Sequence, residues 1–159
     1  MNNWYSNPTI VNCTFLDNST NQDGGAVAVT HESTVTVINS ILWDNAPDEV
    51  YVEGDSSCSV SYSDCLGGCL GAGNIESDPL FVDAAAGDLQ LQTGSPCIDA
   101  ADGAFAPELD IEGYGRVDDP LTSNTGTGTP AYADMGAYEY QAPEPDAGPD
   151  ASPDGGKQP

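Results

Sequence analysis

Short runs in which apolar and polar residues alternate dominate the first half of the chain. They cover residues 24–30, 33–43, 48–54 and 57–63, are rich in Val, Ile, Thr and Tyr, and are bounded by Gly, Asp, Asn or Ser. Alternation with a period of two places successive side chains on opposite faces of a strand, and the bounding residues favour turns. No segment carries the periodicity of an amphipathic helix. The pattern predicts an all-β protein made of short strands.

The alternating half of the chain also repeats itself. Residues 10–18, IVNCTFLDN, align with residues 37–45, VINSILWDN, at an offset of 27, and a weaker copy, VSYSDCLGG at residues 60–68, follows 23 residues later. A repeat of this length is typical of β-solenoids, whereas helical repeats mostly exceed about thirty residues. In a parallel stack the repeats would place like residues over one another: Phe15 over Leu42, Cys13 over Ser40 over Ser63, and Asn18 over Asn45.

A hairpin-built sandwich is the competing all-β architecture. It would need frequent two-residue turns of the Asn-Gly or Asp-Gly type between alternating strands. Ahead of the last nineteen residues, such a dipeptide occurs only at Asp23-Gly24 and Asp102-Gly103, and neither separates two alternating runs. The sequence therefore predicts a short parallel β-solenoid of about two to three rungs over residues 1–73.

The composition changes after the third copy of the repeat. Residues 74–140 contain Pro, Gly and Asp turns around two short strand-like segments, near 80–82 and 89–91, and end in a strand-like segment at 134–140. Open β edges invite aggregation, so a solenoid needs an atypical terminal unit. We expect residues 74–140 to form an irregular C-terminal cap that covers the open end of the stack. The acidic, Pro-rich residues 141–159 are predicted to be a disordered tail.

The charge balance is strongly acidic, because 26 Asp and Glu residues oppose only Arg116 and Lys157, and the formal net charge is −24. A field this negative repels phosphates, which excludes nucleic acid and anionic lipid surfaces as partners. No apolar stretch of about 18 residues is present, so no membrane span is expected. The acidic residues predict a solvated surface, with a Ca²⁺-binding surface or adaptation to high salt as the alternatives.

Five cysteines leave at least one thiol outside an intramolecular disulfide. Cys58, Cys65 and Cys69 lie within twelve residues of sequence, which predicts a local disulfide, either Cys58–Cys65 or Cys65–Cys69, in an oxidising compartment. A zinc site would need four ligands, and the spacing of these cysteines matches no common zinc motif.

Candidate catalytic residues are few. A uronate lyase needs a basic side chain near its substrate, and the foldable part of the chain offers only Arg116. A glycosidase needs carboxylates at a defined separation, and the adjacent pair Asp118-Asp119 lies in a loop without His or Lys partners. His31 lies at a strand end without a triad-like partner nearby in the sequence. We therefore expect no catalytic residues and no enzyme activity.

Two sets of residues are weaker candidates for binding. A structural Ca²⁺ site, the one cofactor considered, would use four acidic residues that lack the pattern of a calcium loop: Asp110, Glu112, Asp118 and Asp119. Aromatic rings can stack on sugars if they are exposed along one face, with packing in the core as the alternative. Four aromatic residues are candidates, with the last two favoured: Trp4, Tyr5, Trp43 and Tyr51.

Two tetrapeptides resemble a known repeat family. The GGAV at residues 24–27 and Phe15-x-x-Asn18 are similar to the GGA[ILV] and FxxN motifs of polymorphic outer-membrane-protein repeats, which occur in secreted and autotransported parallel β-helices. The ordered run SILWDNAPDEVYVEG…SVSYSDC…GAGNIESDPLFVD…GDLQLQTGSPCIDA…DIEGYGR…DMGAYEY resembles the C-terminal region of many bacterial right-handed β-helix surface proteins, often called a choice-of-anchor domain. The similarity covers nearly all of residues 8–140.

The resemblance implies a non-catalytic, extracellular or cell-surface scaffold of the pectin-lyase-like β-helix class, adhesin-like, with a glycan or protein as partner. It also implies that further rungs precede residue 1, so that the chain is the C-terminal part of a longer surface protein. The alternative is the end fragment of a carbohydrate-active β-helix enzyme whose cleft lies on those rungs. Because a stable stack normally needs about three repeats, we expect the isolated chain to be marginally stable or to self-associate through its uncovered N-terminal rung.

Overall fold

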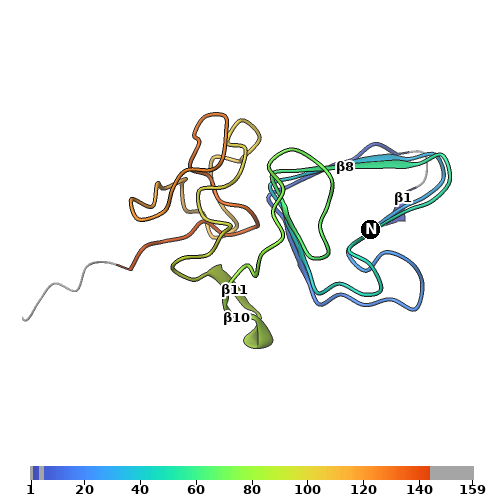
Figure 1. The fold of residues 1–159 in the computed structure, drawn as a ribbon, viewed down its shortest axis with the longest axis horizontal. Coiled ribbons are helices and arrows are strands. Elements are labelled where there is room, and N and C mark those ends of the chain that lie inside the picture. The colour runs from blue at the N-terminus through green and yellow to red at the C-terminus, as the bar shows by residue number, and fades with distance from the viewer. Residues whose placement is uncertain (1, 4–5, 144–159) are drawn as a thin grey trace, which may run out of the picture.

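The computed structural model describes residues 2–3 and 6–143, and the first half of the chain is a stack of parallel strands (Figure 1). Three sheets contain three strands each. They are β1 (Asn2–Asn3), β4 (Val27–Val29) and β7 (Val50–Val52); β2 (Thr9–Val11), β5 (Thr34–Ile38) and β8 (Ser57–Ser61); and β3 (Thr14–Leu16), β6 (Ile41–Trp43) and β9 (Asp64–Cys65). The prediction of an all-β fold with parallel strands is confirmed.

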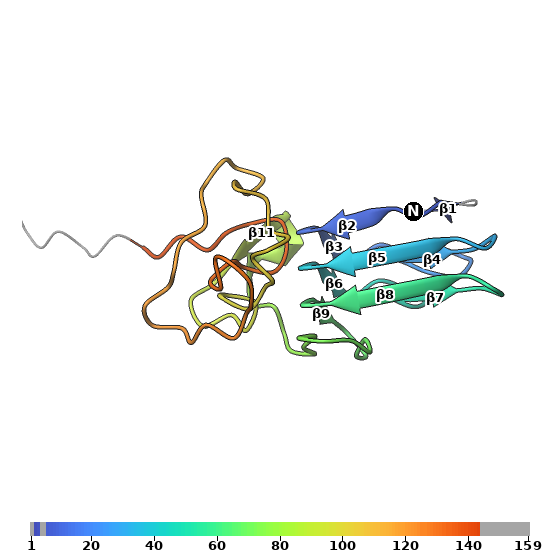
Figure 2. The same cartoon turned by 90° about the horizontal axis from the view of Figure 1, so that it is seen from above.

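Each turn of the chain contributes one strand to every sheet, so the strands form three rungs: β1–β3, β4–β6 and β7–β9 (Figure 2). The register pairs Ile10 with Val37 and Val37 with Val60, which reproduces the offsets of 27 and 23 in the sequence. The difference of four residues lies in one connection. Ten residues, 17–26, link β3 to β4, whereas six residues, 44–49, link β6 to β7.

The tetrapeptide GGAV lies where this longer connection packs against the second rung. Gly24 has a φ of +74°, which favours glycine, and its neighbour Gly25 donates its N–H to the carbonyl of Asp48 at 2.7 Å. A Cβ added to Gly25 would lie 2.5 Å from the backbone nitrogen of Ala46. The motif therefore allows close approach of two backbones between successive rungs.

Alternating residues of the strands enclose an apolar core. Val27 and Val29 of β4 and Val35 and Val37 of β5 are fully buried, and Leu42 of β6 joins them from the third sheet. Burying a Val or Leu side chain contributes roughly 1.5–3 kcal/mol. The alternation seen in the sequence therefore separates core from solvent in the middle rung.

A single residue in the left-handed conformation forms the corner between the second and third strands of every rung. These residues are Asn12 (φ 46°), Asn39 (φ 54°) and Tyr62 (φ 47°). Asn tolerates this conformation better than most residues. The corner at Asn39 divides residues 33–43 into β5 and β6, so the prediction of one strand there was wrong. Alternation in fact stops at Val37, because Val37-Ile38 are both apolar and Asn39-Ser40 are both polar, so the change of sheet falls where the period of two is interrupted.

Like residues stack on one another along this corner, as the repeats predict. The backbone N–H of Cys13 donates to Ser40 Oγ (3.2 Å), and that of Ser40 donates to Ser63 Oγ (3.0 Å). At the next corner, Asn18 Nδ2 donates to Asn45 Oδ1 at 2.8 Å. The predicted pairs are confirmed, and their polar side chains satisfy backbone groups of the neighbouring rung.

A short segment takes the place of a fourth rung after β9. Ser63 donates its N–H to Asn74 Oδ1 (3.1 Å), so Asn74 continues the ladder of serines. The N–H of Tyr62 donates to Ala72 O (2.8 Å), and the N–H of Cys65 donates to Ile75 O (3.1 Å). Residues 72–75 thereby satisfy backbone groups of the third rung that would otherwise face an empty position.

The C-terminal region, residues 76–140, is mostly turns and loops around one antiparallel hairpin. The hairpin consists of β10 (Phe81–Asp83) and β11 (Asp88–Leu91), joined by the 3₁₀ helix η1 (Ala84–Ala86). The two predicted strand-like segments near 80–82 and 89–91 are therefore present. No strand forms at residues 134–140, so that prediction was wrong.

The C-terminal region lies beside the stack and not over its end, which corrects the expected position (Figure 2). It contacts all three rungs: Asn12 of the first, Asn39 of the second and Asp64 of the third each form hydrogen bonds with it. A cap over one end would contact only the last rung. Residues 72–75 instead cover the corner and β9 at the end of the stack, and the C-terminal region runs along the corner between the second and third sheets.

Candidate functional site

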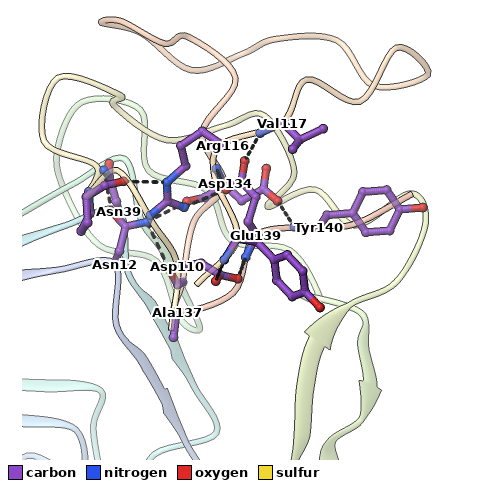
Figure 3. A network of polar contacts seen from close by, with 12 residues as sticks. Asn12, Asn39, Asp110, Arg116, Val117, Asp134, Ala137, Glu139 and Tyr140 are labelled. Carbon is purple, nitrogen blue, oxygen red and sulfur yellow. Dashed lines mark hydrogen bonds and ion pairs between the residues drawn. The ribbon is translucent and has the colours of Figure 1, made fainter. Parts of the chain in front are cut away.

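The junction between the stack and the C-terminal region is built from buried polar groups (Figure 3). Asn12 Nδ2 donates to the carbonyl oxygens of Asp134 (2.9 Å) and Gly136 (3.1 Å). Asn39 Nδ2 donates to Asn12 Oδ1 (3.1 Å) and to Asp102 O (2.9 Å), while its Oδ1 accepts the N–H of Asp102 (2.8 Å). The left-handed corners thus direct both amides out of the apolar core and toward the C-terminal region.

Two buried carboxylates hold separate segments of the C-terminal region together. The carboxylate of Asp134 accepts the backbone N–H groups of Asp99 (2.8 Å) and Tyr140 (2.6 Å). The carboxylate of Glu139 accepts those of Val117 (2.8 Å) and Asp134 (3.2 Å). These side chains supply the acceptors that a neighbouring strand would otherwise provide. The closing aromatic segment is therefore an irregular chain held by carboxylates.

Arg116 is the only Lys or Arg among the described residues, and it is committed to this network. Its Nη1 lies 2.7 Å from Glu139 Oε2, and the two side chains are 6% and 0% exposed. Its Nε donates to the carbonyl of Pro107 at 2.9 Å. A guanidinium in this arrangement neutralises a buried carboxylate, and both of its contacts hold it within the fold, so it is unsuited to act as the base of a lyase.

Burial, followed by the charge of the neighbouring Glu139 carboxylate, raises the pKa of Asp134 to about 8, while the N–H groups of Asp99 and Tyr140 oppose the change. Burial also raises the pKa of Glu139, against the opposing effects of the Val117 N–H and Arg116. Two carboxylates that close to each other resist a second negative charge. The pair therefore retains a proton near neutral pH.

Asp99 is a second buried carboxylate with an unusual environment. Its side chain is fully buried, and neither carboxylate oxygen meets the geometry of a hydrogen bond. Burial is the main cause that raises its pKa to about 6, and the charges of Asp118 and Asp119 add to it, with partial relief from the Asp119 backbone N–H. A buried acceptor without a partner costs stability when it is charged.

A buried carboxyl–thiol contact links the third rung to the C-terminal region. Cys97 Sγ donates to Asp64 Oδ2 at 3.3 Å, and both residues are fully buried. Burial raises the pKa of Asp64 to about 6, and burial followed by the charge of Asp64 raises the pKa of Cys97 well above its ordinary value. A thiol in this setting is protonated and unreactive.

The four predicted calcium ligands do not converge on one point. Asp110 accepts the N–H groups of Glu112 (2.9 Å), Tyr114 (2.8 Å) and Glu139 (2.9 Å), so its carboxylate organises a turn. The side chain of Glu112 is exposed and accepts a hydrogen bond from Gln90 at 2.9 Å. Within residues 2–3 and 6–143, no three His, Cys, Asp or Glu side chains are grouped so that they could hold a metal ion.

The candidate glycosidase pair is divided between two environments. Asp119 is buried, and its carboxylate accepts the Leu121 N–H (3.2 Å) and the Thr122 hydroxyl (2.7 Å). Asp118 is exposed, and its charge acts on Asp99. One carboxylate of the pair thus holds the loop in shape, which leaves no matched acid and base facing a shared cleft.

The two favoured aromatic candidates lie in different surroundings. Trp43 is half-buried and packs against the apolar cluster of the C-terminal region. Tyr51 lines an open hollow of about 430 Å³ over β4 and β7, together with Asp23 and Glu53. The charge of Asp23 is the main cause that raises the pKa of Tyr51, followed by burial and Glu53. The other candidates, Trp4 and Tyr5, lie outside the described residues.

The sequence interpretation missed the residues that carry the junction. Asn12 and Asn39 were visible in the sequence as an aligned pair in the repeat. Asn tolerates the left-handed conformation, so the pair could have indicated a corner at this position. Asp134 and Glu139 were hidden inside a segment that alternation predicts as a strand. Cys97, far from the cysteine cluster, gave no signal of its contact with Asp64.

The cysteines resolve one of the two alternatives that their spacing left open. Cys65 and Cys69 form the disulfide, with their Cα atoms 5.8 Å apart. Cys13, Cys58 and Cys97 are thiols. The bridge lies where the third rung passes into the segment that covers it, so it fixes the closed end of the stack.

Comparison with known protein families, curated proteins and solved structures finds no match. In the part of the chain that the structure describes, no helix is long and apolar enough to cross a membrane. The site geometry and the stack are therefore the grounds on which function is proposed.

Proposed function

We propose that the chain is a non-catalytic scaffold or adhesin-like module, built as a right-handed, pectin-lyase-like parallel β-helix and forming the C-terminal part of a longer extracellular or cell-surface protein. One observation carries the proposal. The carboxylates of Asp110, Asp134 and Glu139 all accept backbone N–H groups of their own region, and the last two are buried, as catalytic carboxylates often are. Their chemistry is used to hold the fold.

The partner of such a module is a glycan or a protein at the cell surface. The hollow beside Tyr51 supports a glycan, because it combines an aromatic ring with the carboxylates of Asp23 and Glu53 and with hydroxyl groups. A neutral sugar fits better than an anionic one, since the net charge of −24 repels polyanions. The Cys65–Cys69 disulfide fits an oxidising, extracellular setting.

The same hollow is the observation that favours the alternative, an end fragment of a carbohydrate-active β-helix enzyme. Asp23, Glu53 and His31 line it, and such groups act as acids and bases in other enzymes. Against this alternative, the described residues contain no Lys and no Arg besides the buried Arg116. The alternative therefore needs further residues from outside this chain.

An activity and binding screen tests the proposal. The chain is incubated with neutral and acidic polysaccharides, and new reducing ends and unsaturated products are measured. We expect no turnover, and we expect binding to immobilised neutral glycans that Tyr51→Ala abolishes. Tyr114→Ala, which removes an exposed ring from the C-terminal region, is the matched control and should bind normally. Turnover that Asp23→Asn or Glu53→Gln abolishes would support the enzyme instead.

A further inference from the structure

The two ends of the stack differ in whether another segment forms hydrogen bonds with their edge backbone groups. Among the described residues, β4, β5 and β6 pair with strands on both sides, whereas β1, β2 and β3 each pair on one side only. At the opposite end, β7 and most of β8 also pair on one side only, but residues 72–75 bond to the end of β8 and to β9, between Val60 and Cys65. The edge of the first rung has no equivalent of that segment within residues 2–3 and 6–143.

The polar ladder has an acceptor position ready at this open edge. In the second and third rungs, Ser40 Oγ and Ser63 Oγ donate to a carbonyl of their own rung and accept the N–H of the preceding rung. Cys13 Sγ makes the same bond to its own rung, to Val11 O at 3.3 Å. The repeat therefore places Cys13 where the N–H of a preceding rung would arrive.

A groove of about 450 Å³ continues this edge. One wall consists of residues 12–15 of the first rung, and the other includes Pro107, Leu109 and Ile111 of the C-terminal region. No residue of the second or third rung lines it. Leu109 and Ile111 are 56% and 69% exposed. The C-terminal region thus extends past the first rung on its open side, as Figure 2 shows beside β2.

The junction indicates what would fill the groove. Ile41 of the second rung packs close to Gly136, where an added Cβ would lie 2.8 Å from Ile41 Cδ1. Thr14 of the first rung accepts the N–H of Ala137 at 3.1 Å. The first two rungs therefore each present the second residue after the corner to the C-terminal region. One rung further, the same position would face Leu109 and Ile111.

We propose that the groove and the open edges of β2 and β3 receive one further parallel rung, whose residue at the position of Ile41 packs against Leu109 and Ile111. The inference rests on the proposed function, in which the chain is part of a longer β-helix. A second copy stacked head to tail is disfavoured, because residues 72–75 already occupy the edge of its third rung at the end of β8 and at β9, the strands that would have to pair with β2 and β3. A rung joined to the N-terminus does not meet this obstacle, and its strands would run parallel to β2 and β3.

The test adds such a rung to the full chain. A copy of residues 27–49 is fused directly before residue 1, which reproduces the connection between the second and third rungs because Asn2 aligns with Ala28 and Ala28 with Tyr51. Alkylation by a maleimide is followed by mass spectrometry. We expect Cys13 to react about tenfold more slowly, while Cys58 on the third rung, the internal reference, is unchanged.

Two further variants decide the outcome. Leu109→Asp with Ile111→Asp should restore Cys13 alkylation in the extended chain and leave the original chain unchanged. In a second extended chain that carries Cys13→Ser, Cys at the copied position of Ile41 and Leu109→Cys should cross-link on oxidation. Unchanged alkylation without cross-linking would overturn the inference, and so would concentration-dependent protection of Cys13 in the original chain, which would identify a second copy as the occupant. None of these readouts measures glycan binding or turnover, so the proposed function is judged separately.

Discussion

The stack and the C-terminal region satisfy buried backbone groups in opposite ways. In the stack, successive rungs pair with each other, as when the N–H of Ile41 donates to the carbonyl of Cys13 at 2.9 Å, around a core of uncharged side chains. In the C-terminal region, the carboxylates of Asp110, Asp134 and Glu139 accept the N–H groups. The first arrangement relies mainly on backbone carbonyls, although Glu49 accepts the N–H of Asn45 at 3.0 Å and Asp64 accepts that of Ser77 at 3.2 Å. The second depends on the charge state of acids and therefore on pH.

The largest expected effect comes from breaking the one buried ion pair. Arg116→Ala leaves Glu139 buried without its counter-charge, and removing one partner of a buried pair typically costs about 3–5 kcal/mol. The free energy of unfolding, measured by urea denaturation, should fall by that amount. Lys157→Ala removes the same charge from beyond the described residues and serves as the control. Equal stability of both variants would contradict a structural role of the pair.

A core substitution in the stack should cost slightly less and show no dependence on pH. Leu42→Ala removes a fully buried side chain, and such changes cost about 2–5 kcal/mol. The loss should be the same at about pH 5 and about pH 8, because no titratable group replaces the side chain. Val52→Ala, at a position 41% exposed, is the control and should cost much less. A Leu42→Ala effect that changed with pH would contradict the expectation that the core of the stack does not depend on pH.

Removal of the disulfide should have a smaller, local effect. The double variant Cys65→Ser, Cys69→Ser opens a short loop, for which the chain-entropy estimate is about 2 kcal/mol. Hydrogen exchange should become faster in residues 66–75, which cover the third rung, and stay unchanged in β4 and β5. Cys58→Ser, which removes a thiol from the same strand-rich segment, is the matched control. Faster exchange throughout the stack would mean that the closed end stabilises all three rungs.

The substitution with the smallest expected effect, Asp99→Asn, tests the pH dependence of the C-terminal region. The folded pKa of Asp99, about 6, lies above the ordinary value of 3.8, so its favourable contribution is complete below about pH 4 and is lost as pH rises through 6. Asp99→Asn removes this loss and should stabilise the protein at about pH 8, with little change at about pH 4. Thermal unfolding at both pH values measures it. Asp88→Asn, at a site with no such clash of charges, is the control, and an equal gain from both variants would argue against an effect of burial.

Much of the stack could be predicted because its information is local and repeated. The alignment of Phe15 with Leu42 predicts a register that the structure confirms, and the ladder of Cys13, Ser40 and Ser63 follows from the same alignment. The division of residues 33–43 at Asn39 was missed, because the composition of the segment favours one β-forming run although its alternation stops just before the left-handed corner. The offset between repeats therefore predicts neighbours, while the local turn decides which sheet each strand joins.

The C-terminal region could be predicted only as an irregular unit. The residues that position it, Asn12, Asn39, Asp134 and Glu139, contact partners more than sixty residues away or depend on the burial that the fold creates. A carboxylate has no sequence signature for accepting a distant N–H, since Asp is equally frequent in solvated turns. Its lateral position, the groove beside Leu109 and the raised pKa of Asp134 share this origin. Repetition encodes the contacts of the stack along the chain, whereas long-range packing and desolvation create those of the junction.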